Sequence, residues 1–334
     1  MDRLNLKIIQ RLQFGFPVCE YPYARVAHEL GLSESDLIER LDQLLYSKVL
    51  TRFGPMYQAE ALGGALSLMA MSVPKEDFKR VTKIVNGFAE VAHNYERNHQ
   101  LNMWFVVATE VPEQLDTVLA KIEQQSGYRV FNMPKLEEFF VGLYLELYPL
   151  SNTPELRASV LDTDVHEAAR QSLSALDRQL IIHTQEGLPL APRPYHVLSL
   201  ILNISADEIM ARLEKMLSMG VIRRIAAVPN HYKLGYRNNG MTVWDVSDEQ
   251  VRELGKKIGN LPFVSHCYHR PRHLPEWRYN LFAMVHGKSK PEVEGYIDRI
   301  RMLLGSALQA QDVLYSTRIL KKTGLRLDAN RSAA

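Results

Sequence analysis

The stretch LNLKIIQRLQFGFPVCEYPY, residues 4–23, has a counterpart in LDRQLIIHTQEGLPLAPRPY, residues 176–195. At one fixed offset the two stretches share a glycine, a proline and a tyrosine: Gly15 and Gly187, Pro17 and Pro189, Tyr23 and Tyr195. The same register continues without a gap as far as Arg52 and Arg224. A repeat of this length reveals how a chain is organised, so the sequence predicts a tandem duplication.

Each copy opens with a pattern of three short helices. In the first copy we expect helices over residues 4–12, 23–30 and 34–45, with Gly31 as a helix stop and Ser33 as an N-cap. In the second copy Asn203 and Ser205 stand at the turn and the cap. This pattern is typical of a helix-turn-helix, and residues 49–53 and 221–227 are expected to be wing strands.

The second part of each copy alternates strand and helix patterns. The first copy shows them over 65–73, 75–88, 90–97, 102–109, 112–125 and 130–147, and the second over 241–246, 247–258, 263–270, 279–286, 290–304 and 313–319. This order is the βαββαβ arrangement of a ferredoxin-like unit. We therefore predict an α+β fold, a tandem duplication of winged helix-turn-helix and ferredoxin-like units that resembles the Lrp/AsnC architecture.

The expected domain limits follow from these patterns. They are a winged-helix domain over 1–60, a ferredoxin-like domain over 61–150, a linker over 151–174, a second winged-helix domain over 175–230 and a second ferredoxin-like domain over 231–328. Members of the Lrp/AsnC group pair through the ferredoxin-like domain. The resemblance thus implies an internal pseudo-dimer, and it leaves open whether this pairs again into a homo-oligomer.

The composition indicates an ordinary globular protein. The chain has 334 residues, 46% of them hydrophobic and 23% charged, with a net charge of +2. Its two cysteines, Cys19 and Cys267, are too few and too far apart for a disulfide framework or a four-ligand zinc site. A signal peptide and an apolar run of membrane-spanning length are both missing. We expect a cytoplasmic protein with no membrane contact.

The two predicted recognition helices have the wrong charge for DNA. The helix over 34–45 carries four acidic side chains against Arg40, and its counterpart carries three against Arg212 and Lys215. Because DNA readers place Lys and Arg near the phosphates, the sequence disfavours DNA binding. It favours winged helices that serve as packing modules, although a lysine cluster assembled in three dimensions would restore DNA binding.

One motif, H-x-Y-x-R, occurs in both ferredoxin-like segments. It reads His93, Tyr95 and Arg97 in the first copy, and His266, Tyr268 and Arg270 in the second. Since side chains alternate along a strand, each triplet is expected to project from one face. A proton donor, a hydroxyl and a permanent cation together indicate the floor of a polar pocket. The plainer alternative is that each residue is an ordinary sheet residue with a local partner.

The second copy surrounds its triplet with further cations and rings. The loop after the strand, HRPRHLPEWRY (269–279), adds Arg272, His273, Trp277 and Arg278. The segment NHYKLGYRNNGM (230–241) adds His231, Tyr232, Tyr236 and Arg237, whereas its first-copy counterpart PMYQAEALGGALS (55–67) is nearly uncharged. Guanidinium groups bind carboxylates and an indole stacks on a ring, so these residues are suited to a planar polycarboxylate. The two halves are therefore not equivalent.

Other site chemistries lack their motifs. The chain has no H-E-x-x-H pair, Walker-A loop, G-x-S-x-G elbow or G-x-G-x-x-G after a strand. We expect no metal site built by protein ligands alone. A single histidine could still be an axial ligand to a bound haem-like iron.

Three stretches resemble the siroheme decarboxylases, relatives of Lrp/AsnC regulators that act in heme d1 synthesis and in the alternative heme pathway. They are VPNHYKLGYRNNGMTVWDV (228–246), FVSHCYHRPRHLPEWRYNLFAMVHG (263–287) and VAHNYERNHQLNMWFV (91–106). The resemblance implies loss of carbon dioxide from two acetate side chains of siroheme, giving 12,18-didecarboxysiroheme. Siroheme is then the substrate, and no separate cofactor is needed. Members often occur as two different subunits, which this chain would hold fused.

The roles expected of the site residues combine the motif and the resemblance. We expect His266, Tyr268, His93 and Tyr95 to be the catalytic proton donors. Substrate binding is expected of Arg270, Arg272, His273, Trp277, Arg278, His231, Tyr232, Tyr236, Arg237, Arg97 and His99. Two alternatives stay open, a DNA-binding regulator of the Lrp/AsnC type and a haem-binding carrier without activity. The sequence also leaves open whether one or both triplets act, and in which pathway.

Overall fold

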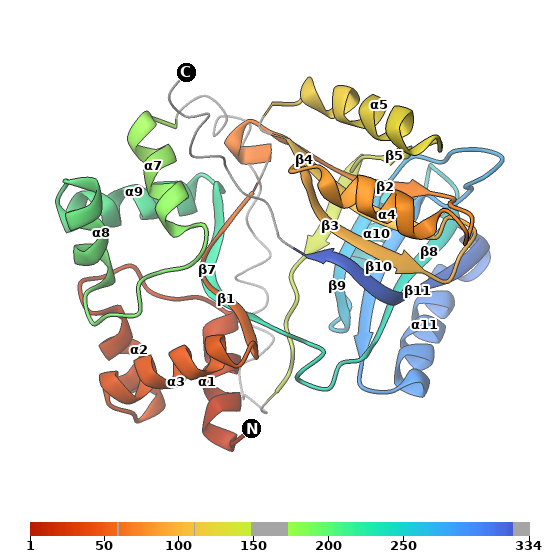
Figure 1. The fold of residues 1–334 in the computed structure, drawn as a ribbon. Helices are drawn as coiled ribbons and strands as arrows, with labels where there is room; N and C mark the ends of the chain where they lie inside the picture. Colours follow the sequence, from red (N-terminus) through yellow and green to blue (C-terminus); the bar gives the residue numbers. More distant parts are fainter. Residues whose placement is uncertain (59, 110, 148–172, 323–334) are drawn as a thin grey trace. The chain divides into compact units, whose positions relative to one another are not determined.

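The chain divides into two compact units, each built from both copies of the repeat (Figure 1). The computed structural model describes residues 1–58, 60–109, 111–147 and 173–322, so most of the predicted linker 151–174 lies outside the described residues. Within the described residues, the first unit contains Met1–Gly63 and the segment from Leu145 to Leu234, and the second contains Gly64–Tyr144 and residues 235–322. The two helix-turn-helix segments thus form one unit, and the two ferredoxin-like segments form the other.

Among the described residues, the first unit has three helices from each copy. They are α1 (Arg3–Gln13), α2 (Pro22–Leu30) and α3 (Glu34–Tyr46), then α7 (Ala175–Thr184), α8 (Pro194–Leu202) and α9 (Ala206–Ser218). Ser33 and Ser205 cap α3 and α9, because each side chain accepts a hydrogen bond from a backbone N–H in the first turn. Gly31 and Asn203 end α2 and α8 in the left-handed conformation. The predicted helices and caps are confirmed.

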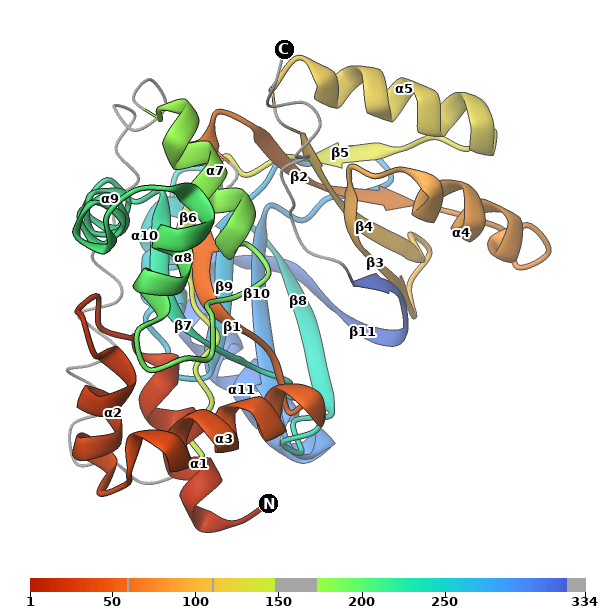
Figure 2. The same cartoon turned by 60° about the vertical axis from the view of Figure 1, so that its left-hand side comes forward.

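The predicted wing strands pair with each other instead of forming a wing within each copy. Strand β1 (Leu50–Tyr57) runs antiparallel to β7 (Ile222–Pro229), and the helices of each copy lie at opposite ends of this ribbon (Figure 2). Equivalent bonds run both ways, since Tyr23 donates to the carbonyl of Pro189 over 2.8 Å and Tyr195 to that of Pro17 over 3.2 Å. The prolines and tyrosines that reveal the repeat therefore hold its two copies together.

The second unit contains a nine-stranded sheet within the described residues, in the order β5-β2-β4-β3-β11-β8-β10-β9-β6. The first copy supplies β2 (Ala65–Met71), α4 (Phe78–Gly87), β3 (Val91–Arg97), β4 (Met103–Thr109), α5 (Gln114–Ser126), β5 (Phe131–Met133) and β6 (Glu137–Val141). The second supplies β8 (Asn238–Val246), α10 (Val251–Gly259), β9 (Val264–His269), β10 (Leu281–Gly287), α11 (Lys290–Leu304) and β11 (Leu308–Lys322). The predicted βαββαβ order is confirmed in the second copy, and the first copy follows it with its last strand divided into β5 and β6.

The last strand of each copy is shared between the two copies. Strand β11 pairs with β8 of its own copy through Tyr315 and with β3 of the other copy from Ser316 onward. In the first copy β5 pairs with its own β2, whereas β6 pairs with β9 of the second copy. The single strand predicted over 130–147 is thus divided in two. Pro134 stands at the division, where it has no N–H to donate and a fixed φ.

Helices cover one face of the sheet in each copy, and the other faces share a core. Helices α4 and α5 pack on the first-copy strands, and α10 and α11 on the second-copy strands. The shared inner core takes large side chains from both copies, among them Trp104, Trp277, Phe282 and Leu314. Apolar burial of this extent is the main stabilising contribution to such a fold. Among the described helices, none combines the length and the apolarity needed to span a bilayer.

Candidate active site

The two His–Tyr pairs lie on the inner face of the sheet. His93 and Tyr95 on β3 stand opposite Val106 and Trp104, and His266 and Tyr268 on β9 stand opposite Met284 and Phe282. Directly opposed residues share a face, and Trp104 and Phe282 belong to the inner core. The strand pattern therefore placed each histidine and tyrosine together on one face, as predicted.

The two triplets have nearly the same geometry. The ring centroids of His93 and Tyr95 are 6.3 Å apart and those of His266 and Tyr268 are 6.2 Å apart, with 36° between the ring planes in both pairs. The guanidinium carbon lies 5.7 Å from the tyrosine ring centroid for Arg97 and 4.6 Å for Arg270. At these distances the cation is attracted to the ring face.

Both triplet arginines are buried and donate to the backbone of the exchanged strands. Nη1 of Arg97 donates to the carbonyl of Leu314 over 2.8 Å, and Nη1 of Arg270 donates to that of Met133. Both acceptors lie just before the point where the strand passes to the other copy. These bonds fix the point at which each strand passes to the other copy, and they hold each arginine against the tyrosine of its triplet. Binding of a substrate carboxylate by either arginine stays a prediction.

A chain of hydrogen bonds extends from the second-copy histidine and includes residues that the sequence reading missed. Nδ1 of His266 lies 2.9 Å from Oγ of Ser265, and that oxygen lies 2.7 Å from Nε2 of His286. Nδ1 of His286 lies 2.7 Å from Oδ1 of Asn239. Ser265 precedes the motif on β9 and His286 lies near the end of β10, so only the antiparallel register of the two strands brings them together.

The first copy has no equivalent chain. Its corresponding positions hold Ala92 before the motif and Ala108 paired with Leu66, where the second copy pairs His286 with Asn239. Nδ1 of His93 is buried and has no hydrogen-bond partner within the described ranges. Burial, assisted by the positive charge of Lys322, lowers the pKa of His93 to about 4. This imidazole is neutral at pH 7, which is the form that ligates metals.

The aromatic residues of the second-copy loop are part of the inner core. Trp277 is fully buried, and its ring centroid lies 5.4 Å from that of His99 and 5.1 Å from that of Trp104. The backbone of His273 exchanges two hydrogen bonds with that of Trp277, and its Nε2 lies 2.8 Å from the carbonyl of Asn132. The structure thus uses these rings to seat the loop, and their contact with a ligand stays a prediction.

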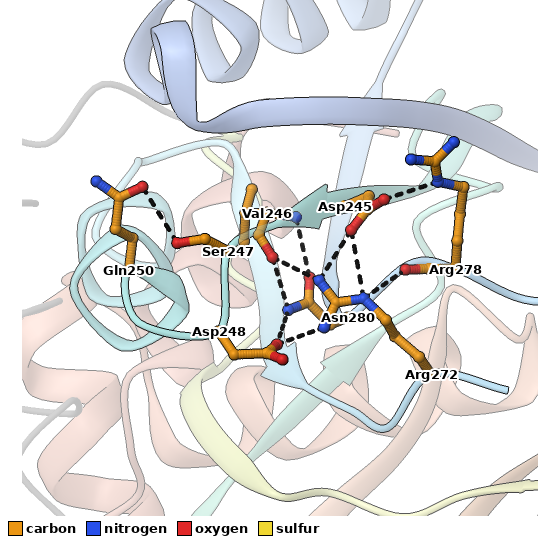
Figure 3. A network of polar contacts seen from close by, with 8 residues as sticks. All are labelled: Asp245, Val246, Ser247, Asp248, Gln250, Arg272, Arg278 and Asn280. Atoms are coloured by element: carbon orange, nitrogen blue, oxygen red, sulfur yellow. Dashed lines mark hydrogen bonds and ion pairs between the residues drawn. The ribbon is translucent and has the colours of Figure 1, made fainter. Parts of the chain in front are cut away.

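Two loop arginines share a buried carboxylate (Figure 3). Asp245 is only 3% exposed, and its two oxygens accept hydrogen bonds of 2.8 Å from Arg272 and 2.7 Å from Arg278. Arg272 also bonds to Asp248, and this hydrogen bond holds the pKa of Asp248 below its usual range. Asp245 lies in β8 and Asp248 just after it, more than twenty residues before the loop, so the motif alone did not indicate that these cations are already paired.

The remaining predicted residues fall in different places. His231 and Tyr232, whose ring centroids are 4.2 Å apart, close the first unit, and Tyr236 and Arg237 begin the second. Arg237 is exposed, and its guanidinium has no hydrogen bond or ion pair within the described part of the chain. Among the described residues, no group of three or more His, Cys, Asp or Glu side chains could hold a metal ion.

The arginines of the two recognition helices are each paired within the first unit. Arg40 on α3 bonds to Asp2 over 3.0 Å, and Arg212 on α9 bonds to Asp177 over 2.8 Å. An arginine used for such a pair is less available to a phosphate. The structure adds this observation to the acidic character of both helices.

Two domain families match this chain, and both match it twice. The AsnC-like ligand binding domain matches residues 61–139 and 233–321, and the siroheme decarboxylase NirDL-like HTH domain matches 5–50 and 177–223. The siroheme decarboxylase of Hydrogenobacter thermophilus is 32% identical over 324 residues, which cover 96% of this chain and 93% of that protein. The chain belongs to the siroheme decarboxylase family.

Other members of the siroheme decarboxylase family match the chain in part or in full. The siroheme decarboxylase NirH subunit of Pseudomonas aeruginosa is 61% identical over 152 residues, 46% of this chain and 89% of the subunit. The crystal structure of the siroheme decarboxylase NirDL is 28% identical and superposes with a TM-score of 0.73 over 99% of this chain and 96% of that one. A second structure of NirDL, in co-complex with an iron-uroporphyrin III analogue, gives 28% identity and a TM-score of 0.69 over 97% and 93%. The predicted family and duplicated fold are confirmed.

Proposed function

We propose that this siroheme decarboxylase family member removes carbon dioxide from two acetate side chains of siroheme and releases 12,18-didecarboxysiroheme. The observation that carries the proposal is the pair of matched His–Tyr–Arg triplets on one face of the sheet. The complex of the relative NirDL with an iron-uroporphyrin III analogue supports a tetrapyrrole substrate. The iron belongs to the substrate, and the proposal needs no separate cofactor.

The triplets supply the chemistry that decarboxylation requires. When the bond to the carboxylate breaks, its electron pair stays on the methylene carbon, which must then take up a proton. The His266 imidazole is the proton donor in the second copy, assisted by the hydroxyl of Tyr268, and His93 and Tyr95 hold the equivalent positions in the first. A positioned general acid of this kind contributes roughly 10²–10⁴-fold to the rate.

Three of the five site arginines are assigned to carboxylates that do not react. A cation on the departing carboxylate would stabilise the ground state and slow its loss. Arg97 and Arg270 already donate to backbone carbonyls and lie against the tyrosine rings, so their part is to hold the tyrosines in place. The exposed Arg237 is a candidate to bind a spectator carboxylate, together with the paired Arg272 and Arg278.

One assay tests this function. The purified protein is incubated with siroheme without oxygen, and the product mass is followed for the loss of two carbon dioxide units. Siroheme that binds and is recovered unchanged would indicate a carrier. A salt-sensitive shift of duplex DNA, with no mass change, would indicate a regulator. The pairing of Arg40 and Arg212 within the first unit makes the regulator the weaker alternative.

A further inference from the structure

Four side chains on three adjacent strands form one hydrogen-bonded chain in the second copy. His266 and Ser265 lie on β9, His286 on β10 and Asn239 on β8. Ser265 is 3% exposed and bridges the two imidazoles over 2.9 Å and 2.7 Å, and both histidines are half-buried. A buried hydroxyl between two titratable rings can accept a proton from one and donate its own to the other.

The far end of this chain fixes which nitrogen of His286 carries hydrogen. Nδ2 of Asn239 donates to the carbonyl of Tyr236 over 3.3 Å, so the amide turns its Oδ1 toward His286. An amide oxygen only accepts, and Nδ1 of His286 therefore carries a proton in both charge states. Gain and loss of a proton at His286 then take place at Nε2, the nitrogen that faces Ser265.

We propose that His286 stores a proton for the second-copy site and passes it through Ser265 to His266 during decarboxylation, an inference that rests on the proposed function. Before the step His286 is cationic, and Ser265 donates to Nδ1 of neutral His266. The carbon–carboxylate bond breaks and carbon dioxide leaves. The electron pair on carbon takes the proton from Nε2 of His266, whose Nδ1 takes the proton of Ser265. Oγ of Ser265 takes the proton from Nε2 of His286.

This transfer consumes one proton, changes no oxidation state and leaves both imidazoles neutral. His266 never becomes a cation beside the substrate, so it adds no ground-state attraction to the departing carboxylate. The first copy cannot act in this way, because Ala92 and Ala108 replace the hydroxyl and the second imidazole. His286 thus stores a proton and Ser265 positions and passes it, and both serve the second-copy triplet alone.

The charged groups around this chain are few and mostly paired locally. On β6, Val141 stands opposite His266 and Glu138 opposite Tyr268. Near His286, Lys288 lies 5.1 Å from the ring centroid of Tyr236. Arg252 of α10 pairs with Glu137 of β6. The helices on the other face also carry the pairs Lys257 with Glu253 and Lys290 with Glu294, the capping carboxylate of Glu292 and the exposed Lys256. None of these replaces Ser265 as the link between the two imidazoles.

The test compares Ser265→Ala, His286→Gln and Ser265→Thr under single turnover at saturating siroheme. His286→Gln keeps a hydrogen-bonding side chain that cannot store a proton, and Ser265→Thr keeps the hydroxyl. Ser67→Ala is the matched control, because Ser67 is a buried serine of the same sheet whose hydroxyl bonds to Asn132 and, among the described residues, to no histidine. Siroheme binding, followed by absorbance, checks that the site is intact.

We expect Ser265→Ala and His286→Gln to slow one of the two decarboxylations by about tenfold or more. Both should also shift the midpoint of the pH–rate profile, a change that a purely structural role would not cause. Ser265→Thr should restore most of the rate, and Ser67→Ala should keep the wild-type rate and profile. Wild-type rates and pH profiles in both Ser265→Ala and His286→Gln would overturn the relay.

A second readout separates the relay from the proposed function. The ¹⁵N shifts of His266 and His286 are followed by NMR over a pH titration of the full chain without substrate. We expect a coupled titration in the wild type and separate titrations in Ser265→Ala. If siroheme is not decarboxylated by the wild type, the proposed function fails while a coupled titration still supports proton sharing. Independent titration of the two rings in the wild type would overturn proton sharing itself.

Discussion

His93 and His266 occupy equivalent strand positions, yet their imidazoles have different surroundings. His266 has a serine hydroxyl within 2.9 Å of Nδ1, and through it a second histidine. His93 has no hydrogen-bond partner for Nδ1 among the described residues and a pKa lowered to about 4. At neutral pH His266 is suited to proton transfer, whereas His93 is suited to ligate iron or to remain a neutral hydrogen-bond donor.

The first prediction concerns His266→Ala. Loss of this proton donor should lower the rate at saturating siroheme by about 10²–10⁴-fold and leave the affinity for siroheme nearly unchanged. Anaerobic turnover measured by product mass, with binding measured by absorbance, checks both expectations. His93→Ala is the matched variant and should retain more of the turnover. A His266→Ala enzyme as fast as the wild type would remove this residue from the mechanism.

The second prediction concerns the stability of the protein at acid pH. Burial lowers the pKa of His93 to about 4 from the usual histidine value of 6.5, so between these values the unfolded chain binds more protons than the folded one. The contribution of His93 to the free energy of unfolding is therefore fully present above pH 6.5 and is lost as the pH falls toward 4. His93→Phe should flatten this part of the curve.

Urea denaturation at pH 7 and at pH 5 measures that difference. The comparison of wild type with His93→Phe cancels the carboxylates that titrate in both proteins. A pH dependence of stability that is equal in the two proteins would contradict the assignment.

At the scale of elements, ion pairs to strand β8 anchor the loop after β9. Arg272 and Arg278 both bond to Asp245, whose side chain is 5% exposed (Figure 3). Asp245→Asn leaves two guanidinium groups with a neutral partner and should lower the free energy of unfolding by about 2 kcal/mol. Asp248 is the matched control, because its side chain is 71% exposed and Asp248→Asn should cost less than about 1 kcal/mol.

Thermal or chemical denaturation of the two variants tests this difference. The Asp245→Asn protein should also lose order in the loop, seen as faster amide exchange at Trp277 and His273, whose backbones are bonded to each other. Equal stability of the two variants would show that Asp245 does not anchor the loop.

The elements themselves were largely predictable from the sequence, and their partners were not. Serine caps, a glycine or asparagine stop and apolar spacing are local signals, and they located the helices and the βαββαβ order. Pairing of β1 with β7 and of β6 with β9 joins segments far apart in the chain, and no local pattern reports it. The same limit applies to the site: alternation placed His266 and Tyr268 on one face, but Asp245 and His286 reach it only through the fold.

At the scale of the molecule, each copy is completed by strands of the other. In the second unit β11 is paired with β3 and β6 with β9, and in the first unit β1 is paired with β7. We therefore predict that residues 1–150 and 151–334, produced as two separate chains in one cell, purify as a one-to-one complex. Each half produced alone should aggregate, because its strand edges have lost their partners.

Size-exclusion chromatography with mass measurement tests this prediction, and siroheme turnover by the reassembled complex is the functional readout. The uncut chain, treated in parallel, is the control for yield and activity. A half that is soluble, monomeric and cooperatively folded by itself would show that the exchanged strands are dispensable.

The shared last strands have a further consequence for how the two sites can change over generations. When two identical subunits exchange strands, every substitution is inherited by both sites at once, and a change that helps one is imposed on the other. In a single chain each half has its own coding sequence and can change independently of the other. Serine and histidine can therefore arise in one half while alanines stay in the other, and the obligatory pairing still delivers both sites to every molecule.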